Sequence, residues 1–201
     1  KEDFAYECDL FAKRGYVVAT IQYRLGSPAD DQIEEILRVY RADQDAQAAM
    51  RWVVDNASTY SIDTDWMFVG GVSAGSVIAH DLVYLQQSDW DAAFSFVSLQ
   101  LGGLNSSGNS LTHSFTLKGL YNNCGSIYGP GVRSEEMVPT IAFHKTYDHL
   151  VPVDTSTTTN SYGSRTMHNW LQDQGVCTEL TLDTNYYNPT SGQLHCPFFD
   201  V

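Results

Sequence analysis

Basic residues are scarce in this sequence, and long apolar runs are absent. Lysine and arginine number 11 against 24 aspartate and glutamate residues, which gives a formal net charge of −13 at pH 7. Such a surface repels nucleic acid and anionic membranes and leaves neutral or cationic small molecules as easier ligands. No apolar run approaches the ~20 residues of a membrane span, and no signal peptide is recognisable at the start. We therefore expect no nucleic-acid partner and no membrane span.

The four cysteines lack the spacing of a metal site. Cys8, Cys124, Cys177 and Cys196 contain no C-x-x-C pair and no zinc pattern, and we expect neither a metal ion nor another cofactor. Two disulfides in any of three connectivities, or four buried thiols, both remain open at this stage. Low lysine content beside abundant Asp, Ser, Thr and Asn favours a secreted or periplasmic protein.

The rest of the composition is that of a single globular domain over residues 1–201. The chain is 43% hydrophobic and 12% aromatic, so it can bury a sizeable core. Strand-like runs alternate with helix-like stretches, which predicts an α/β fold with a mostly parallel sheet flanked by helices. The expected strands cover residues 17–22, 66–70, 116–121, 139–144 and 178–183, and the expected helices cover 2–13, 42–56, 76–85 and 162–174.

The segment Gly71-Val72-Ser73-Ala74-Gly75 has the G-x-S-x-G pattern of a nucleophile elbow. An apolar run precedes it and a helix-like stretch follows it, which is the context that such an elbow requires. The strained turn pushes the Ser73 Oγ out of the sheet, and glycine at 71 and 75 avoids collisions with the neighbouring strand and helix. The helix directs its first N–H groups at the developing oxyanion, so the Ala74 N–H is the predicted oxyanion-hole donor. The alternative is a glycine-rich turn without chemistry.

Two stretches are expected to lack regular structure. Residues 28–35 form a polar, acidic connection, and residues 86–114 are irregular. We interpret 86–114 as a cap-like insertion above the elbow, with a plain long connection as the equal alternative. The tract 155–160 is expected to be a polar loop.

A nucleophilic serine needs a general base, and six histidines are candidates. They are His80, His113, His144, His149, His168 and His195. His80 is expected to point along the flank of the elbow helix, His113 lies in a polar stretch and His168 on a surface helix. His195 lies in a loop after the last expected strand, where a base can reach a nucleophile, so it is the predicted base. A surface-loop histidine without a role is the alternative.

Asp148 is the predicted acid that orients this base. It lies just beyond the expected strand 139–144, in a turn that ends at residues 151–152. A carboxylate at that place can accept from an imidazole N–H and fix its tautomer. Asp154 and Asp183 are the alternatives, and an N-cap or solvated turn residue is the non-catalytic interpretation.

The order Ser73, Asp148, His195 is that of α/β-hydrolases. The chain resembles the carboxylesterase and lipase branch of that superfamily, and within it the bacterial esterases of the extended carboxylesterase type. The matching stretches follow the family order and are residues 11–26, 45–53, 71–75, 147–152 and 192–195. The resemblance implies a serine hydrolase that acts through an acyl-enzyme on small or short-chain esters.

The resemblance also implies an oxyanion loop upstream of this sequence. In such esterases a His-Gly-Gly-Gly-like segment, whose backbone N–H groups complete the oxyanion hole, precedes the helix that carries the equivalent of residues 11–15. The sequence starts inside that helix. We therefore expect the N-terminal strands and the oxyanion loop to be missing from this sequence. The chain would then be a fragment with further upstream sequence, or one chain of a nicked protein whose N-terminal segment is a separate chain and a partner.

Two other functions remain open. A serine peptidase of the same fold would use the same three residues, because triad chemistry alone does not separate ester from amide substrates. A non-catalytic binding module of hydrolase fold would have no need for all three.

Overall fold

The computed structural model describes residues 4–26, 31–128, 133, 136–158, 160–184 and 195–196. The chain divides into two compact units, one of residues 1–65 and 101–116 and the other of residues 66–100 and 117–201. Every residue of the predicted site belongs to the second unit. The expectation of one domain over residues 1–201 stays a prediction. No helix among the described residues is long and apolar enough to cross a lipid bilayer.

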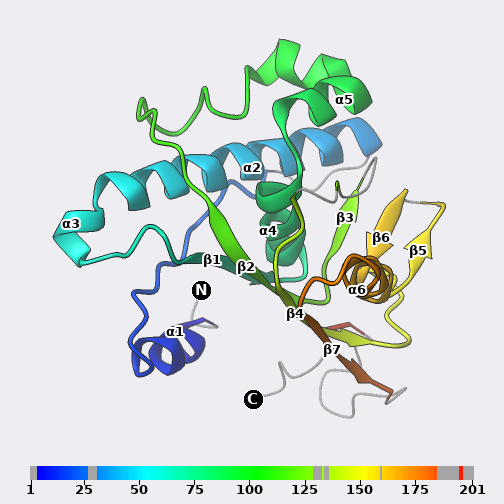
Figure 1. Ribbon diagram of the computed structural model, residues 1–201. Helices are drawn as coiled ribbons and strands as arrows, with labels where there is room; N and C mark the ends of the chain where they lie inside the picture. The colour runs from blue at the N-terminus through cyan, green and yellow to red at the C-terminus, as the bar shows by residue number, and fades with distance from the viewer. Residues whose placement is uncertain are drawn as a thin grey trace. The chain divides into compact units, whose positions relative to one another are not determined.

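The second unit is built on a parallel sheet of four strands in the order β1-β2-β4-β7 (Figure 1). The strands are β1 (Met67–Val72), β2 (Leu117–Asn123), β4 (Thr140–Lys145) and β7 (Thr178–Asp183). β2 is almost continuously buried, whereas residues of the edge strand β7 alternate in exposure, as expected for central and outer positions. The parallel ladder places the carboxyl ends of the strands at one edge, and the predicted α/β class is confirmed.

Three described helices follow the strands of this unit along the chain: α4 (Ala74–Tyr84), α5 (Gln87–Leu101) and α6 (Ser164–Asp173). α4 packs on β1 and β2, and α6 packs on β4 and β7. One cluster of buried side chains joins α4, β2, β3 (Ser126–Tyr128) and α6; its members are Ala79, Tyr84, Leu120, Ile127 and Met167. This core holds the elbow helix and the strand ends in fixed positions.

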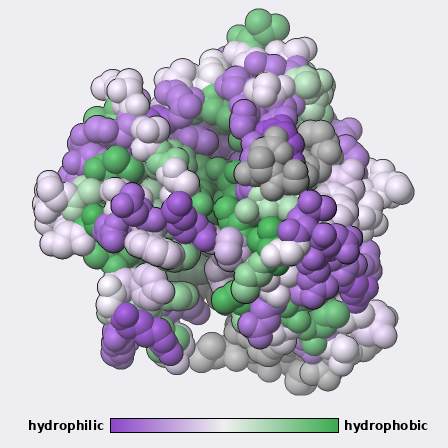
Figure 2. All heavy atoms as spheres, in the orientation of Figure 1, coloured by the Kyte–Doolittle hydropathy of each residue, from purple (hydrophilic) through white to green (hydrophobic). Residues whose placement is uncertain are grey.

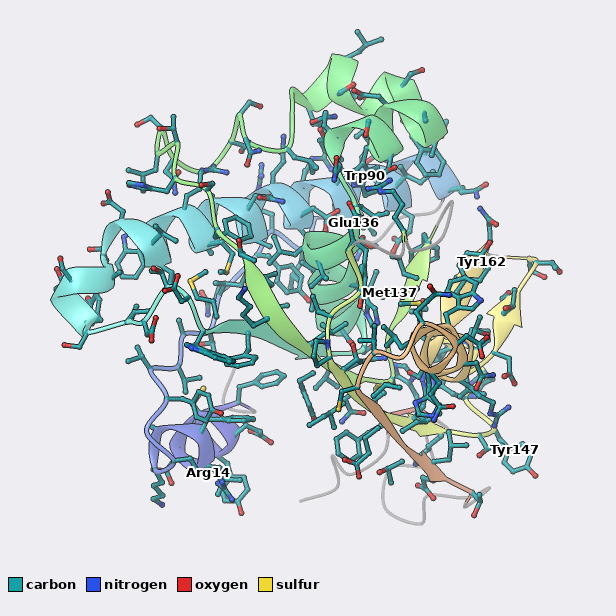
Figure 3. The ribbon with its side chains drawn as sticks, viewed as in Figure 1. Arg14, Trp90, Glu136, Met137, Tyr147 and Tyr162 are labelled. Atoms are coloured by element: carbon teal, nitrogen blue, oxygen red, sulfur yellow. A yellow bond between two sulfur atoms is a disulfide. The ribbon has the colours of Figure 1, made fainter. Side chains whose placement is uncertain are left out.

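A small antiparallel sheet was not expected from the sequence. Its strands, β3 (Ser126–Tyr128), β6 (Ser161–Gly163) and β5 (Thr155–Ser156), pair in the order β3-β6-β5. β5 lies within the tract 155–160, which we expected to be only a polar loop. Strands of two or three residues leave no period in a sequence, and here tertiary contacts define them. Tyr162 of β6, labelled in Figure 3, packs against Trp170 with ring centres 4.7 Å apart.

The prediction that residues 86–114 are irregular is wrong for their first half, which forms α5. Asp89 Oδ2 accepts from the Gln86 N–H at 2.7 Å, which is one half of a capping box. Trp90 and Val97 lie two turns apart and are both buried. Phe94 between them has non-helical angles (φ −145°, ψ 63°), so a kink interrupts the apolar period and hides the helix from a sequence pattern.

The first unit contains α1 (Ala5–Ala12), α2 (Gln32–Asp55) and α3 (Ala57–Tyr60). α2 begins ten residues before the predicted start at 42, so the expected connection over 28–35 is wrong from residue 32 onward, and residues 28–30 of it lie outside the described residues. Asp31 caps α2 by accepting from the Glu34 N–H at 2.8 Å. Acidic residues in a first turn are stabilised by the helix dipole, so these charges indicate a helix start and not a loop.

The predicted strand over 17–22 is also wrong: residues 16–26 have no regular secondary structure. A strand exists only with a hydrogen-bonded neighbour, and no described strand pairs with this stretch. Val17 and Ile21 are exposed. Exposed hydrophobic residues are not unusual in this protein: on the face drawn in Figure 2, hydrophobic residues lie among hydrophilic ones. Arg24 attaches the end of the stretch to α2 through Asp45, whose carboxylate accepts from the Arg24 backbone N–H at 2.8 Å and from its Nε at 2.9 Å.

Candidate active site

Ser73 lies at the sharp turn between β1 and α4. Its backbone angles are φ 52° and ψ −123°, a region that residues with a Cβ rarely adopt. The Ser73 N–H donates to the Asn123 carbonyl at 2.9 Å, which joins the turn to the end of β2. The Ser73 carbonyl accepts from the N–H groups of Ser76 and Val77, which begins α4. The strain is therefore held in place from both sides.

Glycine is required at one of the two predicted positions. A Cβ at Gly71 would lie 2.2 Å from the carbonyl carbon of Gly75, so no other residue fits there. A Cβ at Gly75 would meet nothing within 4 Å, so the expected collision at that position is wrong. The backbone of Gly75 lies close to Gly71, so the absence of a side chain matters at Gly71 and not at Gly75.

The imidazole of His195 lies between the predicted nucleophile and the predicted acid. Its Nε2 is 2.7 Å from the Ser73 Oγ, and its Nδ1 is 2.6 Å from the Asp148 Oδ2. A carboxylate can only accept, so Nδ1 carries the hydrogen and Nε2 is left to accept from the serine hydroxyl. Residues 192–194 of the predicted histidine loop lie outside the described residues.

Asp148 occupies a fully buried, hydrogen-bonded position. Its Oδ1 accepts from the N–H groups of Leu150 and Val151 at 3.0 and 2.9 Å, and its side chain is 0% exposed. Burial by itself would raise the pKa of this carboxyl, but His144, His195 and the Val151 N–H together hold its pKa well below the usual range. Asp148 is therefore ionised at neutral pH and keeps His195 in the tautomer described above.

The two alternative aspartates make other contacts. Asp154 forms an ion pair with Arg165 at 2.6 Å and is about half exposed. Asp183 ends β7, where its carbonyl accepts from the Thr146 N–H. The structure brings only Asp148 of the three to the histidine that touches Ser73.

Other histidines are engaged elsewhere. His113 pairs with Asp55 at 2.9 Å, and His168 lies 3.1 Å from the Thr178 hydroxyl. His80, which was expected to point along the flank of α4, is fully buried, and its Nδ1 lies 2.7 Å from the Ser76 carbonyl oxygen one turn earlier in that helix. Burial, with a smaller contribution from nearby His144, lowers its pKa to about 4 although the hydrogen bond to that carbonyl acts in the opposite direction. His80 is therefore neutral at pH 7, and its Nδ1 is used in a hydrogen bond within α4.

Ala74 is the first residue of α4, directly after Ser73. The first N–H groups of a helix have no partner within the helix and carry its positive end. The Ala74 N–H is therefore one of the backbone donors at the start of α4, and its role in an oxyanion hole stays a prediction.

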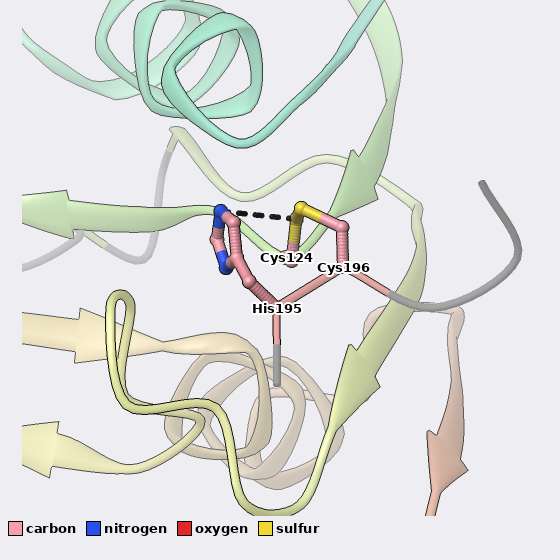
Figure 4. Close-up of side chains that lie close together, drawn as sticks. All are labelled: Cys124, His195 and Cys196. Atoms are coloured by element: carbon pink, nitrogen blue, oxygen red, sulfur yellow. Dashed lines mark hydrogen bonds between the residues drawn. A yellow bond between two sulfur atoms is a disulfide. The ribbon is translucent and has the colours of Figure 1, made fainter. Parts of the chain in front are cut away.

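A disulfide joins Cys124 to Cys196, the residue after His195 (Figure 4). Cys124 follows β2, and its N–H donates to the Phe143 carbonyl at 2.8 Å. The bridge thus attaches the segment of His195 to the end of the sheet, with the Cys124 Sγ 4.0 Å from His195 Nε2. Cys8 and Cys177 are free thiols, so neither alternative from the sequence holds: the four cysteines form one disulfide and leave two free thiols.

The side chains of Cys124, His195 and Cys196 do not fit a metal ion. Their potential donor atoms all lie within 4.8 Å of one another. Metal ligation by cysteine needs the thiolate, however, and both sulfurs are bonded to each other. His195 Nε2 is in addition already in contact with the Ser73 hydroxyl.

Loss of the disulfide should impair hydrolysis through the position of His195. We expect Cys196→Ser to lower kcat/KM for an activated ester by about 10–100-fold, because displacements near 1 Å at a reacting group have effects of this size. The bridge closes a loop of 72 residues, so stability should fall by about 4 kcal/mol in the chain-entropy description. Ester kinetics and thermal unfolding, with and without dithiothreitol, measure both effects. Cys177→Ser, at an exposed free thiol, is the control, and full activity of Cys196→Ser would contradict the expectation.

Comparisons with known proteins agree with the fold. The model of a family described as BD-FAE matches residues 1–95. The apo form of Thermogutta terrifontis esterase 2 is similar with a TM-score of 0.59 and 20% identity over 96% of this chain and 70% of that chain. Its propionate-bound form has a TM-score of 0.58 and 20% identity, over 90% of this chain and 65% of that chain. Its form phosphoramylated by tabun has a TM-score of 0.58 and 20% identity, over 90% of this chain and 64% of that chain. The comparison with curated proteins finds no match.

The chain thus spans about two thirds of the length of these esterase structures, and at 20% identity the likeness concerns the fold. The parallel sheet, the elbow between β1 and α4, and the order serine, aspartate, histidine are all found in the described residues. The resemblance drawn from the sequence is confirmed at this level: the chain has the α/β-hydrolase fold.

Proposed function

We propose that this chain carries the catalytic residues of a carboxylic-ester hydrolase. The observation that carries the proposal is the single imidazole of His195, which bridges the Ser73 hydroxyl at 2.7 Å and the Asp148 carboxylate at 2.6 Å. A serine on a strained elbow, a base in the accepting tautomer and a buried ionised acid are the parts that acyl transfer requires.

The geometry supports the following sequence of steps. His195 Nε2 takes the proton of the Ser73 hydroxyl while Oγ bonds to the ester carbonyl carbon, and the Ala74 N–H stabilises the oxyanion. The tetrahedral intermediate breaks its bond to the alcohol oxygen, and His195 returns the proton to that oxygen. Water then attacks the acyl-enzyme with His195 again as base, which releases the acid and restores the Ser73 hydroxyl. Asp148 remains ionised and stabilises the imidazolium in both halves.

Small or short-chain esters are the proposed substrates. One supporting fact is that the similar Thermogutta terrifontis esterase 2 has been captured with propionate bound, and another that tabun forms an adduct with it. The disulfide beside His195 supports a secreted or periplasmic location, since such bonds persist in oxidising compartments. The supply of a second oxyanion donor by upstream sequence or by a separate chain stays a prediction.

A panel of chromogenic substrates tests this function. The purified protein should hydrolyse p-nitrophenyl acetate and butyrate faster than p-nitrophenyl dodecanoate, and p-nitroanilides of the same acids should react far more slowly. Comparable rates on anilides would identify a peptidase instead. Absence of turnover on every ester, with the N-terminal segment that supplies the second oxyanion donor present, would favour the non-catalytic binding module.

A further inference from the structure

Four buried polar side chains form a continuous hydrogen-bonded series between the elbow helix and the acid turn. The Ser76 Oγ lies 2.6 Å from the Asn122 Oδ1, and the Asn122 Nδ2 lies 2.8 Å from the Ser164 Oγ. The Ser164 Oγ lies 2.6 Å from the His144 Nδ1, and the His144 Nε2 lies 2.9 Å from the Val151 carbonyl oxygen. The four residues whose side chains form this series (Ser76, Asn122, Ser164 and His144) are at most 1% exposed, so water does not compete for these bonds.

The direction of donation along this series is fixed at both ends. The Gly125 N–H, which can only donate, reaches the Asn122 Oδ1 at 2.9 Å. The Asn122 amide is thereby oriented with its NH₂ toward Ser164, whose hydroxyl hydrogen then goes to the His144 Nδ1. The Val151 carbonyl can only accept, so the hydrogen of His144 is on Nε2. Every bond is satisfied with His144 neutral.

Val151 connects this histidine to the acid. Its carbonyl accepts from His144, and its N–H donates to the Asp148 Oδ1 at 2.9 Å. The His144 Nε2 is also 3.6 Å from the Asp148 Oδ2, the oxygen that binds His195. His144 thus faces the acid from β4 without touching Ser73 or His195 in any contact described above.

We propose that His144, held as the neutral Nε2–H tautomer by Ser164 and Asn122, is the positioning residue of Asp148. The inference rests on the proposed ester hydrolase function. His144 fixes the 148–151 turn through its hydrogen bond to the Val151 carbonyl, and its ring lies beside the carboxylate with Nε2 3.6 Å from Oδ2. Because it is neutral, the imidazolium that forms at His195 is the cation that the Asp148 charge stabilises.

The sequence contains no signal for this role. Each member is a single polar residue in a different element: α4, β2, β4 and α6. His144 was one of six candidate bases, and only the pairing of β2 with β4 and the packing of α6 bring the four side chains together.

Kinetics of His144→Phe test the role of the N–H. This variant keeps a ring of similar size but removes both hydrogen bonds, so we expect kcat for p-nitrophenyl butyrate to fall about 10–100-fold with KM nearly unchanged. His144→Gln, which can again place an amide N–H toward Val151, should recover most of the rate. His168→Phe, at the histidine on α6 bonded to Thr178, is the matched control and should keep wild-type kinetics. Wild-type kcat in His144→Phe would overturn the proposal.

Nitrogen-15 NMR of the wild-type histidine rings supplies a readout independent of activity and of variant folding. The proposal requires His144 to show a protonated Nε2 and a bare Nδ1 at neutral pH, and Ser164→Ala should weaken that tautomer preference. A protonated Nδ1 would overturn the inference alone, in a protein that still hydrolyses esters. An inactive wild-type protein with the expected spectrum would contradict the proposed function instead.

Discussion

Replacing Ser73 with alanine is expected to lower kcat for p-nitrophenyl acetate by about 10⁴–10⁶-fold, because the remaining residues can then stabilise an oxyanion but cannot form an acyl-enzyme. The Ser73 Oγ is the atom that His195 Nε2 contacts at 2.7 Å. Alanine keeps the Cβ, so the strained backbone at φ 52° is no worse in the variant, and thermal stability should change little.

Covalent labelling checks the same assignment without relying on a rate. A fluorophosphonate probe should add one adduct to the wild-type protein by intact mass, with the modified peptide containing Ser73, and none to Ser73→Ala. Ser98→Ala, which removes a partly exposed hydroxyl from α5, is the control and should label like the wild type. Labelling that persists in Ser73→Ala would mean that another residue is the nucleophile.

The elbow could be predicted because its physics is local. Glycine is required at 71 because a Cβ there would lie 2.2 Å from the Gly75 carbonyl carbon, only four positions away, so a short motif contains both residues. The last strand was predicted at 178–183, which are its bounds in the structure, since alternation of exposure on an edge strand appears directly as a period of two. In both cases a short stretch of sequence carries a visible signal, although β7 still depends on its pairing with β4 and the elbow on the Asn123 carbonyl.

Long-range causes explain what the sequence did not reveal. The stretch 17–22 has strand-like composition, but a strand depends on a partner that local sequence does not contain. The choice of Asp148 over Asp154 and Asp183 likewise depends on which turn His195 reaches, and the pairing of Cys124 with Cys196 depends on where β2 ends. The order of residues along the chain therefore gives candidates for the acid and for the disulfide, and only the contacts at the end of the sheet show which residues pair.

Asp148→Asn should lower kcat by about 10⁴-fold through a change of tautomer. The N–H groups of Leu150 and Val151 both donate to Oδ1, so the amide oxygen of the variant will take that place and its NH₂ will take the place of Oδ2. The NH₂ then faces the His195 Nδ1, at the position now 2.6 Å away, and can only donate to it. His195 must accept at Nδ1 and carry its hydrogen on Nε2, where it can no longer take the proton of the Ser73 hydroxyl.

Asp154→Asn is the matched control for this result. It makes the same chemical change six residues away, at a carboxylate whose partner is Arg165 and whose side chain is 56% exposed. Exposed ion pairs contribute about 0–1 kcal/mol, so kcat should stay within about twofold of wild type and stability should change little. Steady-state kinetics of both variants, with circular dichroism to verify the fold, separate the two aspartates. If Asp154→Asn abolished hydrolysis while Asp148→Asn retained it, the hydrogen bond to His195 would not be the one that orients the base, and the acid would have to be reassigned.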